Sequence, residues 1–131
     1  MTPNLTSADV SKRLLELAER CEAATGRGRA LEESIAIALG WKPYEFEDEN
    51  DYHERGWHSP GNPMPHSSIP RWTASLGAAM ILVPEGWWAV VDTKGRATLF
   101  PERGSGSQLM AKAETPALAL CAAALRARAV S

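Results

Sequence analysis

Residues 75–88 read Ser-Leu-Gly-Ala-Ala-Met-Ile-Leu-Val-Pro-Glu-Gly-Trp-Trp and join a short apolar helix to an aromatic strand. We expect the helix over residues 73–82. It ends before Pro84, because the residue that precedes a proline is pushed out of the helical region of backbone conformation. The Pro-Glu-Gly sequence then makes a turn, and the strand begins at Trp87. Helix and strand therefore follow each other within one folding unit.

Two further strands extend this unit into a sheet. Strands are expected over residues 87–92 and 96–100, and Gly95 between them can adopt the positive φ that a tight hairpin requires. A third strand is expected over residues 107–113. An antiparallel meander of this kind buries one face, so helices must cover that face.

Three more helices are expected, over residues 7–24, 31–39 and 116–128. The first has apolar residues at helical spacing on one face, namely Val10, Leu14, Leu17, Ala18 and Cys21. Thr115 suits the N-cap of the last helix, and Pro116 suits its first position. These elements predict a single α+β domain over residues 1–131, in which a three-stranded antiparallel sheet is packed with helices.

The periodic pattern disappears over residues 42–70, which we expect to be a long irregular loop. Five of the nine prolines fall there, at positions 43, 60, 63, 65 and 70. A loop of this length within a compact domain is more often functional than a neutral spacer. Its aromatic residues indicate that part of it packs on the core, and they are Tyr44, Phe46, Tyr52 and Trp57.

The composition is typical of a soluble globular protein. Apolar residues make up 44% of the 131 residues, charged residues make up 23%, and the formal net charge is −2. A chain with this charge has no overall basic field, so nucleic acid is an unexpected partner. The apolar stretches are too short to cross a bilayer as helices, and the first residues do not read as a signal peptide. We therefore expect a cytoplasmic protein with no membrane partner.

Cys21 and Cys121 lie within expected helices, on faces otherwise filled by alanine and leucine. A free thiol in such a position behaves as a small hydrophobic side chain. We expect both cysteines to be buried free thiols, and a disulfide between them is the alternative.

Three segments carry a resemblance to a known family. They are Ser75-Leu-Gly-Ala-Ala-Met80, Leu82-Val-Pro-Glu-Gly-Trp87 and Ala113-Glu-Thr-Pro-Ala-Leu-Ala-Leu-Cys-Ala-Ala-Ala-Leu-Arg126. In these segments the chain resembles the phage alpha-beta-alpha (ABA) sandwich domain of small phage and prophage proteins. The resemblance implies an α-β-α sandwich-like fold and a phage or prophage origin. It offers no catalytic residues, and Gly77 departs from the acidic residue that the family favours.

Tryptophans are candidates for a binding surface, because this residue is enriched at interface hot spots as well as in cores. Trp87 and Trp88 are adjacent in a strand, so they point to opposite faces and one of them is expected to be exposed. An exposed tryptophan with arginines nearby would stack on a nucleotide base or on a partner's guanidinium group. The candidate binding residues are Trp57, Trp72, Trp88, Arg71 and Arg96. The alternative is ordinary packing under the proline-rich loop.

Residues 45–58 collect carboxylates together with His53 and His58, and His66 follows in the same loop. These residue types can bind a divalent metal. Zinc sites usually have closely paired ligands, however, and the five-residue step between His53 and His58 does not provide them. The alternative is a solvated acidic loop, which would offer a negative surface to a basic partner.

We expect a non-enzymatic phage or prophage accessory protein, a binding module that acts on a host protein or assembles with itself. The first alternative is a small-ligand binder that sequesters a host signalling nucleotide as an anti-defence protein, with Arg71 and Arg96 on the phosphate. The second is a small enzyme or metal-binding protein that uses the histidines of the loop. No cofactor is expected.

Overall fold

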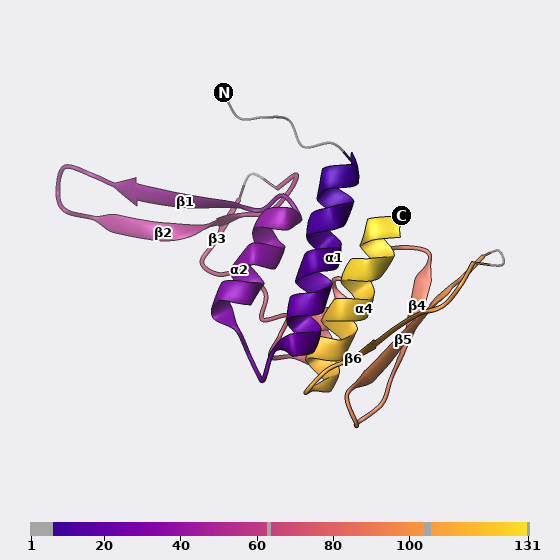
Figure 1. Cartoon of the computed structure of the whole chain (residues 1–131). Helices are drawn as coiled ribbons and strands as arrows, with labels where there is room; N and C mark the ends of the chain where they lie inside the picture. The colour runs from indigo at the N-terminus through magenta and orange to yellow at the C-terminus, as the bar shows by residue number, and fades with distance from the viewer. Residues whose placement is uncertain (1–6, 63, 104–105, 131) are drawn as a thin grey trace.

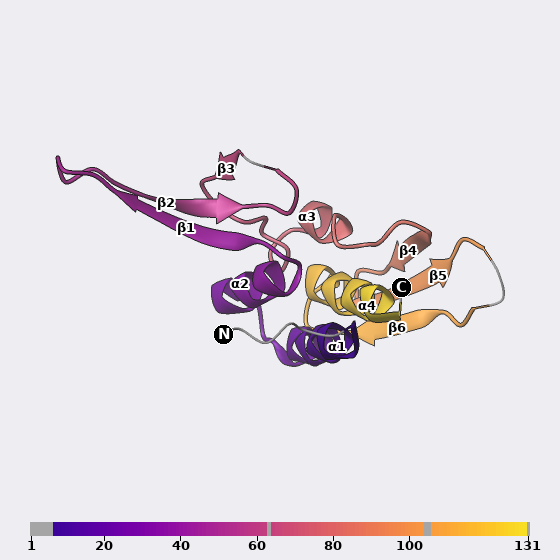
Figure 2. The same ribbon diagram turned by 90° about the horizontal axis from the view of Figure 1, so that it is seen from above.

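The computed structural model describes residues 7–62, 64–103 and 106–130 of the chain. The helices of this described part are α1 (Ser7–Ala23), α2 (Arg29–Ala38), α3 (Leu76–Met80) and α4 (Pro116–Val130). Its strands are β1 (Lys42–Glu47), β2 (His53–His58), β3 (Pro65–His66), β4 (Trp87–Val91), β5 (Arg96–Pro101) and β6 (Leu109–Lys112). The strands form two antiparallel sheets, and the helices lie between them (Figure 1 and Figure 2). The α+β class predicted from the sequence is confirmed.

The three-stranded antiparallel sheet predicted for the second half of the chain is also confirmed. Its strands β4, β5 and β6 pair in chain order. Gly95 turns the chain between β4 and β5 with a φ of 86°. A Cβ atom at this position would collide with the carbonyl oxygen of Ala113, which follows β6. Glycine is therefore required here for two reasons, the backbone conformation and the close approach of the next strand.

Helix α4 covers the inner face of this sheet and lies at the centre of the core. It contacts all three strands of the sheet, and α1 packs along its other side. The helix is therefore buried almost all round, which explains why its sequence is rich in alanine and leucine and carries few charges. Thr115 caps it, because the Thr115 Oγ1 atom accepts a hydrogen bond from the backbone N–H of Leu118 at 3.2 Å.

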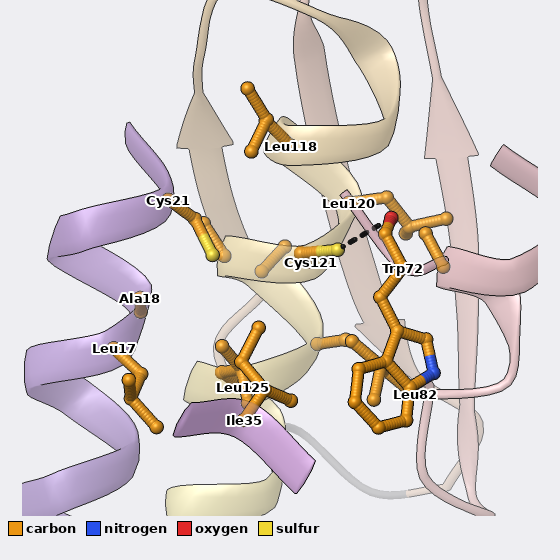
Figure 3. Close-up of a cluster of buried hydrophobic side chains, with 14 of the residues drawn as sticks. Leu17, Ala18, Cys21, Ile35, Trp72, Leu82, Leu118, Leu120, Cys121 and Leu125 are labelled. Atoms are coloured by element: carbon orange, nitrogen blue, oxygen red, sulfur yellow. Dashed lines mark hydrogen bonds between the residues drawn. The ribbon is translucent and has the colours of Figure 1, made fainter. Parts of the chain in front are cut away.

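Side chains from α1, α2 and α4 meet in the core together with Trp72 and Leu82 (Figure 3). Cys21 and Cys121 are both free and buried, as predicted. The Sγ atom of Cys121 donates a hydrogen bond to the carbonyl oxygen of Trp72 at 3.1 Å. Among the described residues, no helix is long and apolar enough to cross a membrane.

The prediction of an irregular loop over residues 42–70 is wrong, because this region contains the second sheet. Strands β1 and β2, each of six residues, form an antiparallel hairpin, and the short β3 pairs with the end of β2. Pro43 does not prevent this pairing, since β1 is an edge strand and has one side free of hydrogen bonds. The density of prolines was therefore a poor guide to this part of the chain.

A tight turn closes the hairpin between β1 and β2. The Asp48 carboxylate accepts hydrogen bonds from the backbone N–H groups of Asn50 and Tyr52, at 2.8 and 2.9 Å. Asp51 adopts a φ of 62°, a conformation that aspartate tolerates better than most residues. Turns stabilised by an aspartate side chain in this way hold the strand ends together without apolar contacts.

The expected helix over residues 73–82 is shorter in the structure, where α3 covers only Leu76–Met80. The side chain of Ser75 caps α3 by accepting a hydrogen bond from the backbone N–H of Ala78 at 3.3 Å. Thr73 instead bonds to the buried carboxylate of Glu32 on α2, through its backbone N–H at 3.1 Å and its hydroxyl at 2.8 Å. These bonds hold the segment before α3 against α2.

The sandwich-like order of layers implied by the resemblance is not seen. Helices cover only the inner face of the β4-β5-β6 sheet, and its outer strand residues Trp88, Val90 and Met110 are exposed. Strands β1, β2 and β3 instead form a second sheet on the far side of the helices (Figure 1). Within the described residues, the outer face of the β4-β5-β6 sheet is consequently left without a covering layer.

Candidate functional site

The uncovered outer face of the β4-β5-β6 sheet is the candidate site, and we refer to it as the open face. Side chains alternate along a strand, so Trp87, Ala89 and Val91 pack against the core while Trp88 and Val90 point away from it. Trp88 is 49% exposed. The prediction that one of the two adjacent tryptophans is exposed is thus confirmed. The open face consists of Trp88, Val90, Arg96, Thr98, Phe100, Met110 and Lys112.

An aromatic pair forms one end of the open face. Trp88 and Phe100 lie directly opposite each other on β4 and β5. Their rings are stacked, with centroids 4.4 Å apart and planes inclined by 19°. The contact limits the motion of both rings, so a partner that packs on them loses little additional side-chain freedom.

Two cations form the other end of the open face. Arg96 on β5 and Lys112 on β6 are directly opposite each other, and both are exposed. Neither side chain has a hydrogen bond or an ion pair to another described residue. A shallow hollow of about 260 Å³ lies beside them and is also lined by Met110 and Glu22. Cationic and apolar surfaces therefore adjoin each other on one face.

The carboxylate of Glu22 does not neutralise these cations, because it is held by other groups. It forms an ion pair with Arg126, and it accepts a hydrogen bond from the backbone N–H of Lys112 at 3.2 Å. The hydrogen bond from Arg126 holds the pKa of Glu22 below its usual value. The side chains of Arg96 and Lys112 are thus left available to an anionic partner.

The other candidate binding residues do not join Trp88 and Arg96. Trp72 is only 1% exposed and lies in the core, where its ring and that of Trp41 meet edge to face at a centroid distance of 6.1 Å. A side chain buried in this way cannot contact a partner, so the prediction of Trp72 as a surface residue is corrected. Arg71 is exposed, but it precedes α3 and does not belong to the open face.

Trp57 lies in a different hollow, a groove of about 620 Å³ between α2 and the β1-β2-β3 sheet. The arginines of this groove are already paired with carboxylates. Arg55 Nε lies 3.1 Å from Glu45 Oε1, and Arg29 Nε lies 3.8 Å from Glu33 Oε1. The groove therefore has less unpaired positive charge for an anionic ligand than the open face has.

The three histidines have separate neighbours. His53 lies 3.0 Å from Glu45, His58 packs on the ring of Tyr44, and His66 Nε2 is 3.2 Å from the hydroxyl of Ser59. Within the described residues, no group of three or more His, Cys, Asp or Glu side chains is arranged to hold a metal ion. The serine–histidine pair also lacks a hydrogen-bonded carboxylate there to orient the imidazole, as catalytic triads require.

The β1-β2 hairpin is a second surface of note, and its strands were missed by the sequence analysis. One of its faces carries aromatic residues, with Phe46 and Tyr52 each about half exposed and their ring centroids 6.3 Å apart. Glu54 lies opposite Phe46 and accepts hydrogen bonds from the hydroxyls of Tyr44 at 2.7 Å and Tyr52 at 3.3 Å. We refer to residues 45–55 as the acidic hairpin.

Comparison with known proteins adds no relative from which a role could be transferred: no family model, no curated protein and no solved structure matches the chain.

Proposed function

We propose that the protein is a non-enzymatic binding module that takes an acidic, partly apolar protein segment on its open face. The observation that carries this proposal is a pair of cations, Arg96 and Lys112, placed directly opposite each other beside exposed apolar side chains, with no side-chain partner among the described residues. Like charges at directly opposed positions of a sheet are destabilising. A carboxylate supplied by a partner would remove that repulsion and gain two charged contacts.

The composition of the open face also supports a protein partner. Tryptophan and arginine are the residues most enriched at the energetic centres of protein interfaces. Trp88 and Phe100 supply a flat aromatic surface, Met110 adds a flexible apolar side chain, and the cations lie at its border. In this arrangement the apolar contacts would supply most of the affinity, while the charges would select the partner.

A phage or prophage accessory role is the context we propose for this binding, and it rests on the sequence resemblance alone. The partner would be a host protein or another copy of the chain, met in the cytoplasm of the bacterial host.

A small anionic ligand is the second candidate, because an aromatic pair and two cations on one face also suit a nucleotide. The site is open and nearly flat, however, whereas small-molecule sites are usually concave. Arg71 lies outside the open face and so would not share a phosphate with Arg96. An enzyme is the third candidate, and the separate surroundings of His53, His58 and His66 give it less support.

Selection from a random displayed peptide library on the purified protein tests the proposal. We expect the selected peptides to combine acidic with aromatic or aliphatic residues, and to bind Trp88→Ala and Arg96→Glu at least about tenfold more weakly than the unmodified chain. Ile37→Ala is the matched control, since Ile37 is an equally exposed apolar residue on α2. The proposal would be contradicted if the selected peptides had no acidic residues. It would also be contradicted if they bound the Trp88→Ala variant as well as the Ile37→Ala control. Nucleotides screened in parallel test the second candidate.

A further inference from the structure

The chain itself carries a segment with the properties that the open face requires. The acidic hairpin contains six carboxylates and one arginine. Glu47, Glu49 and Asp51 at its tip have no hydrogen bond or ion pair from their side chains to any other described residue. Beside them lie the exposed rings of Phe46 and Tyr52. The acidic hairpin is thus the charge complement of the open face.

The arrangement of apolar and charged residues also agrees between the two surfaces. On the open face, the row formed by Val90, Thr98 and Met110 adjoins the row formed by Arg96 and Lys112, two residues further along β5. At about 3.3 Å per residue the two rows are about 7 Å apart. On the acidic hairpin, the rings of Phe46 and Tyr52 lie close together, and the carboxylates of Glu49 and Asp51 lie in the turn between β1 and β2. An apolar part and a charged part therefore adjoin each other on both surfaces.

The hairpin cannot reach the open face of its own chain. It extends away from the helices on the side opposite to the β4-β5-β6 sheet, as both views show (Figure 1 and Figure 2). Any contact between the two surfaces must therefore join two copies.

We propose that the acidic hairpin of one copy docks on the open face of the next copy. This inference rests on the proposed function and names the partner that the open face takes. The carboxylates of Glu49 and Asp51 in the turn meet Arg96 and Lys112, while Phe46 and Tyr52 pack on Met110 and on the Trp88–Phe100 pair. Since the two surfaces differ, the contact is head to tail, and repetition of it gives a closed ring or an open filament.

Charge reversal on each surface tests the docking, measured as the mass in solution by sedimentation velocity over a range of protein concentrations. We expect the unmodified chain to associate, and to do so less at high salt because screening weakens the charge contacts. Arg96→Glu with Lys112→Glu should lose the association, and so should Glu49→Lys with Asp51→Lys. A chain that carries all four substitutions should regain it, because the charges are exchanged and not removed. A chain with Lys12→Glu and Arg13→Glu on α1 is the control, since its net charge changes by the same amount as that of the double variant on the open face.

A second pair of variants tests the head-to-tail arrangement directly. Trp88→Ala damages only the open face, and Phe46→Ala damages only the acidic hairpin. Each variant should be a monomer when alone, and an equimolar mixture should form a dimer with one copy of each, because each contributes one intact surface. A mixture that remains monomeric while the unmodified chain associates would overturn the arrangement.

The remaining outcomes separate this inference from the proposed function. A monomeric unmodified chain would overturn self-docking, while the peptide selection would still decide whether the open face binds another acidic segment. Association that survives both charge reversals would place the interface elsewhere and also overturn the inference. Circular dichroism and thermal unfolding of each variant establish that a lost association is not a lost fold.

Discussion

Arg96 and Lys112 face the same side of the sheet at directly opposed positions of β5 and β6, and both are exposed. Strand positions 97, 99 and 111 on the inner side carry Ala and Leu that pack in the core, so the two cations are confined to the outer side. Their repulsion lowers the stability of the sheet, which is the expected cost of a surface prepared for an anionic partner. Stability and binding should therefore respond in opposite directions to a change at either position.

Lys112→Glu should stabilise the fold and weaken binding. The new carboxylate would lie opposite Arg96, and a cross-strand pair of opposite charges contributes about 0.2–1 kcal/mol. Urea unfolding measures the gain, and binding of the selected peptides measures the loss. Lys94→Glu in the turn is the control, because Lys94 has no opposed cation. An unchanged or lower free energy of unfolding for Lys112→Glu would show that the opposed charges do not repel each other appreciably.

Glu32 is the buried carboxylate on which the segment before α3 depends. It is fully buried, its Oε2 atom accepts two hydrogen bonds from Thr73, and Arg27 and Arg29 approach its Oε1 atom at 3.7 and 3.8 Å. Glu32→Ala should lower the free energy of unfolding by about 1–3 kcal/mol, since it leaves buried polar groups of Thr73 without an acceptor. Glu32→Gln should cost less, because it keeps one acceptor. Urea unfolding provides the measurement.

Glu33→Gln is the matched control for Glu32, since the Glu33 carboxylate is about half exposed and, among the described residues, pairs only with Arg29 at 3.8 Å. An exposed pair of this kind contributes about 0–1 kcal/mol. If Glu32→Ala and Glu33→Gln had the same small effect, the hydrogen bonds to Thr73 would not anchor the segment.

The elements that could be predicted from sequence are those whose signals are local. Helix α1 has apolar residues at helical spacing, α4 is an almost continuous run of alanine and leucine, and Thr115 marks the start of α4. The β4-β5 hairpin has Gly95 at the one position where its turn needs a positive φ. Each of these signals lies within a few residues of the element that it predicts.

The β1-β2 hairpin could not be found in the same way, because most of it is exposed and the alternation of Tyr44 and Phe46 with glutamates in β1 spans only four residues. It is stabilised instead by contacts between the strands, such as the hydrogen bond from Tyr44 to Glu54, and by the turn at Asp48. The polar sequence Asp-Glu-Asn-Asp between two aromatic segments was the available signal, since aspartate and asparagine favour tight turns.

The candidate site was predicted in part. Trp88 followed from the alternation of side chains along a strand, and Arg96 was named as its neighbour. Phe100 and Lys112 were missed, because their positions opposite Trp88 and Arg96 depend on the strand register. Trp72 was assigned to the surface although it is buried, since residue type alone does not distinguish an interface tryptophan from one in the core.

Glu22 should make the stability depend on pH in the acidic range. The hydrogen bond from Arg126 lowers the pKa of Glu22 in the folded chain. The contribution of Glu22 to the free energy of unfolding is therefore present above the pKa of Glu22 in the unfolded chain, near 4.5. It is lost as the pH falls through the lower pKa of Glu22 in the folded chain. At pH 7, Glu22→Gln should lower the free energy of unfolding by about 1 kcal/mol, as for a partly exposed charged pair. Urea unfolding at several values below pH 5 should show the difference from the unmodified chain shrinking; a constant difference would contradict this account.

Cys121 should make the stability depend on pH in the alkaline range, with the opposite sign. Its contact with Cys21, followed by its burial, raises the pKa of the Cys121 thiol in the folded chain. The unfolded chain ionises this thiol near pH 9, so the contribution is complete below that value and falls above it by up to about 1.4 kcal/mol per pH unit. The Cys121→Ala variant has no thiol at this position and so lacks this pH-dependent loss of stability. Urea unfolding under reducing conditions should therefore show the unmodified chain losing stability faster than the variant above pH 9, and parallel profiles would mean that Cys121 ionises as readily in the folded chain as in the unfolded one.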